Sequence, residues 1–112
     1  MSEPNAVRGE FTFEIGEHAF VMVPRFSNIA KIEGALGRPL LQAASAGLTI
    51  ADLVMIVDTL AKPVKPKLTR DEIGDMILDN GGILAVAPLV ENLVLRVVSG
   101  GRMDPEKDAG NG

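Results

Sequence analysis

Hydrophobic and polar residues alternate near the start of the chain in the pattern of a half-buried β-strand. Glu10–Glu14 alternates with a period of two, and His18–Val23 is a second run rich in apolar and β-branched residues. Ile15-Gly16-Glu17 lies between them as a turn, because glycine adopts positive φ without steric cost. Pro24 ends the second run. These residues predict an N-terminal antiparallel β-hairpin.

After Pro24 the apolar residues recur every three or four positions, which is the spacing of amphipathic helices. The first predicted helix begins at Ser27, a residue type that caps helix N-termini, and ends at Gly37, where a C-cap glycine belongs. A second helix has Pro39 in its first turn and runs to Gly47. The inward face of the first helix contains Ile29, Ile32 and Leu36.

The third predicted helix has the clearest start signal. Thr49 and Asp52 have the spacing of a capping box, and Asp52 also interacts favourably with the helix dipole. At about 100° per residue, one face of this helix is apolar, and the other carries Met55 among polar residues. Because methionine adapts to varied partners, Met55 is a candidate protein-interaction residue. The apolar face consists of Ile50, Leu53, Val54, Ile56, Val57, Leu60 and Ala61.

A basic connector follows, because the two prolines of Lys62–Lys67 cannot continue a helix. Thr69 and Glu72 form a second predicted capping box, and the helix that they start ends at Asn80-Gly81-Gly82. Its inward residues are Ile73, Met76 and Ile77.

Three aspartates of this fourth helix, Asp71, Asp75 and Asp79, recur every four residues and form one acidic stripe. Such a stripe can dock a basic partner or a cation, although no EF-hand spacing accompanies it. A solvated helix face is the favoured interpretation of the stripe.

The last predicted helix runs from about Ile83 to Ser99, with a kink or restart at Pro88, and it is apolar on more than one side. Leu84 and Leu95 lie on a different side from its main stripe. A helix of this kind is either central in a bundle or half-covered by another chain, so Leu84 and Leu95 are further candidate interaction residues. The main inward stripe consists of Val86, Val90, Leu93, Val94 and Val97, joined by Ile83 and Val98.

The residue types that carry most enzyme chemistry are missing or isolated. Among 112 residues there is no cysteine, which removes thiolate ligands and redox catalysis and is compatible with a reducing cytosol. The single histidine, His18, lies at the turn end of a strand without a carboxylate cluster aimed at it. We therefore predict a protein with no catalytic residue, no metal and no cofactor.

Charge and hydropathy limit the partners. A net charge of −4 disfavours general binding to phosphate backbones. The N-terminal residues lack the pattern of a signal peptide, and the apolar stretch Ile83–Val98 is too short and too polar to span a membrane. A soluble, cytoplasmic protein is expected. Because 46% of the residues are apolar but only 4% aromatic, part of the apolar surface is expected to bind a partner.

These elements predict one α+β domain over residues 1–100: an N-terminal antiparallel β-hairpin packed on a bundle of about five short helices. Residues 101–112 are predicted to form a disordered polar tail.

A DNA-binding regulator is an alternative function, because Leu40–Ile56 resembles a helix-turn-helix with Thr49–Lys62 as the recognition helix. Asp52 and Asp58 on the outer face of that helix are the wrong residue types to meet base edges and phosphates. No nucleic-acid partner is therefore expected.

The order of the hydrophobic blocks and glycine stops resembles a known family. Ile32-Glu33-Gly34-Ala35-Leu36-Gly37-Arg38-Pro39-Leu40-Leu41 is followed by the small-residue linker Ala44–Thr49 and the amphipathic helix. Thr69–Ile73 then leads through Gly81-Gly82 into an apolar helix. From roughly Arg8 to Gly100, the chain resembles the small tail proteins of gene transfer agents and related prophages of alphaproteobacteria, which are labelled tail tube proteins or tail assembly chaperones. An Asp-Gly or Asn-Gly hairpin turn is typical of that family, whereas this chain has Ile15-Gly16.

The resemblance implies a non-enzymatic role in building a phage-like tail, for a prophage-encoded protein of the bacterial cytoplasm or the virion. A tail assembly chaperone would bind the tape-measure protein and the tube subunit, and a tube subunit would polymerise into stacked rings. Tube proteins are normally rich in β-strand, whereas one hairpin and five helical segments are predicted here. A chaperone is therefore favoured, with the tube subunit as the alternative and a second copy of the chain as a further candidate partner.

Overall fold

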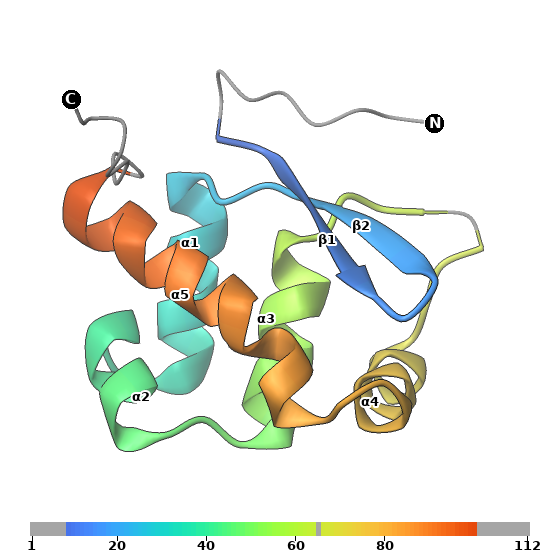
Figure 1. Cartoon of the computed structure of the whole chain (residues 1–112). Coiled ribbons are helices and arrows are strands. Elements are labelled where there is room, and N and C mark those ends of the chain that lie inside the picture. Colours follow the sequence, from blue (N-terminus) through green and yellow to red (C-terminus); the bar gives the residue numbers. More distant parts are fainter. Residues whose placement is uncertain (1–8, 65, 101–112) are drawn as a thin grey trace, which may run out of the picture.

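The computed structural model describes residues 9–64 and 66–100. These residues form two strands and then five helices, β1, β2 and α1 to α5 (Figure 1). The predicted α+β class, with an N-terminal antiparallel hairpin followed by five helices, is confirmed. The predicted disordered tail, residues 101–112, lies outside the described residues.

The hairpin has a two-residue loop. β1 (Phe11–Ile15) pairs with β2 (His18–Met22), and the last pair before the loop is Ile15 with His18. The loop requires a positive φ at Gly16, which is +60°, and glycine adopts this conformation at little energetic cost. The prediction that Ile15 belongs to the turn is wrong. Strand alternation places its side chain on the buried face of β1, where it is 1% exposed.

The first two helices are short and lie next to each other. α1 (Phe26–Leu36) begins at Phe26, with Arg25 as its N-cap, so the prediction that Ser27 caps this helix is wrong. Gly37 ends α1 in the left-handed conformation, as predicted, and α2 (Leu40–Ala46) follows.

α3 (Ile50–Leu60) and α4 (Arg70–Asp79) both begin with the predicted capping boxes. The Thr49 hydroxyl accepts a hydrogen bond from the Asp52 N–H, and the Asp52 carboxylate accepts one from the Thr49 N–H, each at 3.0 Å. Thr69 and Glu72 make the same pair of bonds at 3.1 and 2.8 Å. Each box satisfies backbone N–H groups that a helix N-terminus leaves unpaired, so the helix starts follow directly from local sequence.

Two backbone hydrogen bonds join the end of α3 and the residues after it to the end of β2 and Val23. The Val23 N–H donates to the Leu60 carbonyl at 2.8 Å, and the Lys62 N–H donates to the Val21 carbonyl at 2.9 Å. The start of the basic connector is therefore held beside β2.

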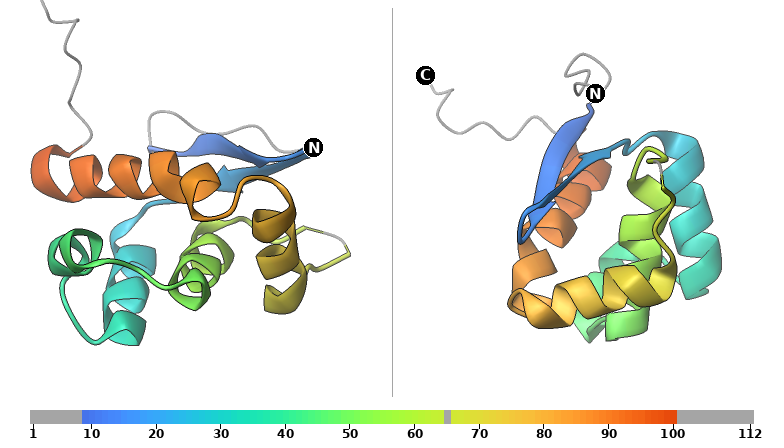
Figure 2. Two further views of the ribbon diagram at one scale, coloured as in Figure 1. Left: turned by 60° about the horizontal axis from the view of Figure 1, so that its bottom comes forward. Right: turned by 90° about the vertical axis from the view of Figure 1, so that its right-hand side faces the viewer.

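α5 (Ile83–Ser99) continues through Pro88 without a restart and ends at Gly100. The hairpin and α5 form one layer, and α1 to α4 form a second layer beneath it (Figure 2). Among the described residues, no single helix is long and apolar enough to cross a membrane. α4 and α5 reach that threshold only when taken together, and they are bent by 112° at the break between them.

α3 lies in the middle of the second layer, in contact with α1, α4, α5 and β2. Every residue from Leu53 to Val57 is buried. Met55, which was expected on the polar face, is 8% exposed and belongs to the hydrophobic core. The expectation is wrong because a helix with neighbours on several sides buries residues outside a single stripe. Met55 is therefore not placed to contact a partner.

Candidate protein-interaction site

α5 has one side that packs on the core. Val86, Leu89 and Leu93 are fully buried on this side, and Val90 and Val94 at its edges are half-buried. The helix contacts α2, α3, α4 and β1. The predicted inward positions of Val86 and Leu93 are therefore confirmed.

The rest of the predicted inward stripe is partly wrong. Ile83, Val97 and Val98 are exposed, and Leu89, which the stripe omitted, is buried. Leu89 lies three positions after Val86 on the same helix face, so spacing alone could have identified it. The exposure of the other three residues depends on how far the neighbouring elements reach along α5, which helical periodicity does not report.

The open side of α5 carries a line of residues with heptad spacing. Each follows the previous one by four, three, four and three positions, so all lie on one helix face. The line consists of Leu84, Pro88, Glu91, Leu95 and Val98, which together we name the α5 face.

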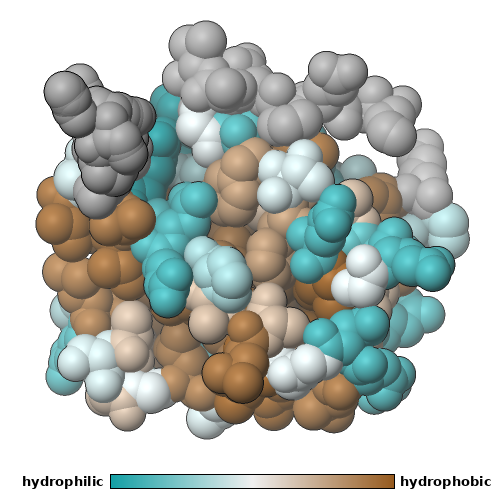
Figure 3. All heavy atoms as spheres, viewed as in Figure 1, coloured by the Kyte–Doolittle hydropathy of each residue, from teal (hydrophilic) through white to brown (hydrophobic). Residues whose placement is uncertain are grey.

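The α5 face is apolar except for Glu91, and it is open to solvent. Leu84 is 82%, Val98 63% and Leu95 39% exposed, and Pro88 and Glu91 are exposed as well. Figure 3 shows hydrophobic surface near both ends of α5, with hydrophilic residues between. At 1.5 Å per residue the face is about 21 Å long. The structure thus brings the predicted residues Leu84 and Leu95 onto one exposed surface.

An apolar hollow of about 350 Å³ lies beside the α5 face, between α2, the start of α3 and α5. Glu91 belongs to both the hollow and the face. The hollow has no signal in the sequence, because it forms only where three helices meet. Its other lining residues are Ala44, Gly47, Leu48, Leu53, Ile83, Ala87 and Val90.

The acidic stripe is exposed, which both of its interpretations, a solvated helix face and a docking surface, require. Asp71, Asp75 and Asp79 all lie on the solvent side of α4, and the first two line a shallow hollow between α3 and α4. Within residues 9–64 and 66–100, no group of three or more histidine, aspartate or glutamate side chains is arranged to hold a metal ion. His18 is exposed, with its ring centroid 5.3 Å from that of Phe20.

The predicted recognition helix of the DNA-binding alternative corresponds to α3, the central helix of the core. Asp58 on this helix accepts a hydrogen bond from Arg70 Nε at 2.8 Å. A recognition helix must project into the major groove, so the burial of α3 argues against that function. Of the residues predicted on its outer, polar face, Asp52 and Asp58 are half-buried and Met55 is buried.

Comparison of the chain with protein-family models, curated proteins and solved structures gave no match. The resemblance to phage-like tail proteins therefore stays a prediction.

Proposed function

We propose that the protein is a non-enzymatic assembly protein of a phage-like tail, acting in the bacterial cytoplasm as a tail assembly chaperone. The observation that supports this proposal is the α5 face, an exposed and mostly apolar line on a helix whose opposite side packs on the core. The resemblance of the sequence to small tail proteins suggests which partners this face binds, namely the tape-measure protein and the tube subunit.

The α5 face has the chemistry of a surface that binds another helix. Burial of apolar surface contributes about 25 cal/mol per Å², so leaving Leu84 and Val98 in water forgoes stabilisation that a partner would provide. Heptad spacing lets a second helix insert its side chains between those of α5. Tape-measure proteins of such tails are helical and aliphatic, which suits this surface.

Glu91 favours a different protein over a second copy of this chain. It lies at the centre of the α5 face, with Leu84 and Pro88 on one side and Leu95 and Val98 on the other. Two copies paired in register through this face would place two Glu91 carboxylates together in an apolar seam, which is unfavourable. A partner helix with a lysine or arginine at the matching position has no such conflict.

The chaperone is favoured over the tube subunit by the proportion of helix. Among the described residues, one two-stranded hairpin accompanies five helices. Rings of tube subunits are sealed by extended sheets, for which this hairpin provides little strand. Transient binding through a helix face needs no sheet.

Co-expression with the tape-measure protein of the same tail gene cluster tests the proposal. We expect the tape-measure protein to be insoluble alone and to co-purify in soluble form with this chain. Equal insolubility with and without the chain would contradict a chaperone role. Electron microscopy of the purified protein distinguishes the alternative, because abundant tubes or rings would indicate a tube subunit.

A further inference from the structure

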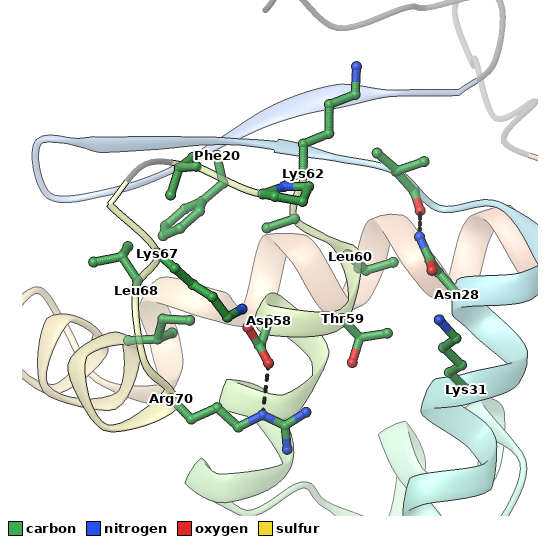
Figure 4. A pocket seen from close by; sticks show the side chains of 15 residues that line it. Phe20, Asn28, Lys31, Asp58, Thr59, Leu60, Lys62, Lys67, Leu68 and Arg70 are labelled. Carbon is green, nitrogen blue, oxygen red and sulfur yellow. Dashed lines mark hydrogen bonds and ion pairs between the residues drawn. The ribbon is translucent and has the colours of Figure 1, made fainter.

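Positive charge is concentrated in one groove of this acidic protein. The groove, of about 510 Å³, lies between α1, the end of α3, the basic connector and the start of α4 (Figure 4). The net charge of the chain is −4, yet Lys31, Lys62, Lys67 and Arg70 all line the groove. The described part of the chain has three further lysine or arginine residues, which lie elsewhere: Arg25, Arg38 and Arg96.

Two of the four cations have acidic partners within the protein. Lys62 Nζ lies 3.0 Å from Glu10 Oε1, and the Lys62 side chain points away from the groove. Arg70 Nε lies 2.8 Å from Asp58, the one acidic residue among the described lining residues. This ion pair neutralises Asp58 and leaves the other N–H donors of the guanidinium for a ligand.

Lys31 and Lys67 provide the positive charge of the groove that acidic side chains do not neutralise. Neither makes an ion pair with an acidic side chain of the described residues. Figure 4 shows Lys31 rising from α1 on one side of the groove, with Lys67 and Arg70 on the other side. Lys31 and Lys67 therefore stand on opposite sides of the groove, whose lining also includes the apolar residues Val23, Ala61 and Leu68.

The connector that carries Lys67 is fixed at both ends. The Lys62 N–H bonds to Val21 of β2 at its start, and the Thr69 capping box holds its end. Pro63 and Pro66 restrict its backbone further. A ligand therefore meets charges on a constrained backbone, which lowers the entropy cost of binding.

We propose that this groove binds an acidic segment of a partner protein, in which two or more aspartate or glutamate carboxylates flank an apolar residue. The carboxylates pair with Lys31, Lys67 and the remaining donors of Arg70, and the apolar residue contacts the apolar part of the groove lining. This site is separate from the α5 face and does not depend on the proposed tail function.

Carboxylates suit the groove better than a nucleic acid does. Phe20 is the one aromatic residue among the described lining residues, and at 2% exposed it offers no face on which a base could stack. Asp71 and Asp75 follow Arg70 on α4 and would repel a phosphate backbone that continued past the groove. A short peptide ends before it reaches them.

The test is a fluorescence anisotropy titration of the full-length protein with a short labelled peptide of alternating leucine and acidic residues. We expect saturable binding that weakens as salt is added. Lys31→Gln and Lys67→Gln should each weaken it about threefold, and the double variant about tenfold, since exposed charge pairs contribute modestly. Arg38→Gln is the matched control, because it removes one positive charge outside the groove and should leave affinity unchanged.

Four results would overturn the proposal. One is the absence of saturable binding to the wild-type protein at low salt. Another is unchanged affinity of the double variant, with circular dichroism showing that it is folded. The third is tighter binding of a single-stranded oligonucleotide that carries the same charge as the peptide. Loss of peptide binding in Arg38→Gln to the same extent as in the groove variants would also count against it, since the effect would then reflect net charge alone.

Discussion

α3 and α5 are both rich in aliphatic residues, but they are buried very differently. Six of the eleven residues of α3 are buried, against three of the seventeen residues of α5. α3 has neighbours around it, whereas the elements that contact α5 leave the α5 face open. The difference shows that an apolar helix face indicates only that the face tends to be buried. It does not indicate whether another element of the same chain or a second chain covers it.

The largest effect is expected from a charge in α3. Met55→Asp would place a carboxylate in the core, at a position that is 8% exposed. Because this charge would be buried among apolar residues, the free energy of unfolding should fall by about 4 kcal/mol or more. Urea denaturation followed by circular dichroism measures this. A variant with near wild-type stability would mean that Met55 faces solvent, and α3 would then resemble α5.

The same substitution, leucine to alanine, at two positions of α5 distinguishes the buried side of the helix from the exposed side. Leu93→Ala should cost about 2–5 kcal/mol, because Leu93 is fully buried and its truncation leaves a cavity. Leu95→Ala, on the α5 face, should cost no more than about 1 kcal/mol, because Leu95 is 39% exposed and its truncation leaves no closed cavity. Similar midpoints for the two variants in urea would contradict the assignment of a closed and an open side.

A smaller effect is expected at the start of α3. Thr49→Ala removes the side-chain half of a capping box and should cost about 1 kcal/mol. Ser27→Ala is the comparison, because α1 takes Arg25 as its N-cap without a side-chain cap bond. Thermal unfolding should show a lower midpoint for the first variant and little change for the second. Equal losses would indicate that Ser27 does cap α1.

Features that depend on a few neighbouring residues could be predicted from the sequence. The capping boxes at Thr49 and Thr69 need only residues three positions apart, and Gly37 ends α1 through its own φ. The sequence also predicts the hairpin, and only the place of Ile15 differs, since it pairs with His18 in the sheet and does not belong to the turn.

Features that depend on distant parts of the chain could not be predicted in this way. Met55 is buried because α3 has neighbours on several sides, and no pattern within α3 contains that information. Lys31 and Lys67 meet at one groove although they are far apart in the sequence. The sequence shows the basic connector as a charged segment, but it does not show that Lys31 of α1 lies across the groove from that connector.

The central difference proposed between the two helices is that the α5 face binds a partner while α3 only supports the core. The double variant Leu84→Asp and Leu95→Asp tests it directly in a titration against the tape-measure protein, with Leu41→Asp, an exposed leucine on α2, as the matched control. We predict a loss of affinity of at least about tenfold for the double variant and none for the control. The double variant should lose no more than about 2 kcal/mol of unfolding free energy, mostly because aspartate has a lower helix propensity than leucine, and it should stay folded. Undiminished affinity in a folded double variant, or its unfolding, would contradict the claim.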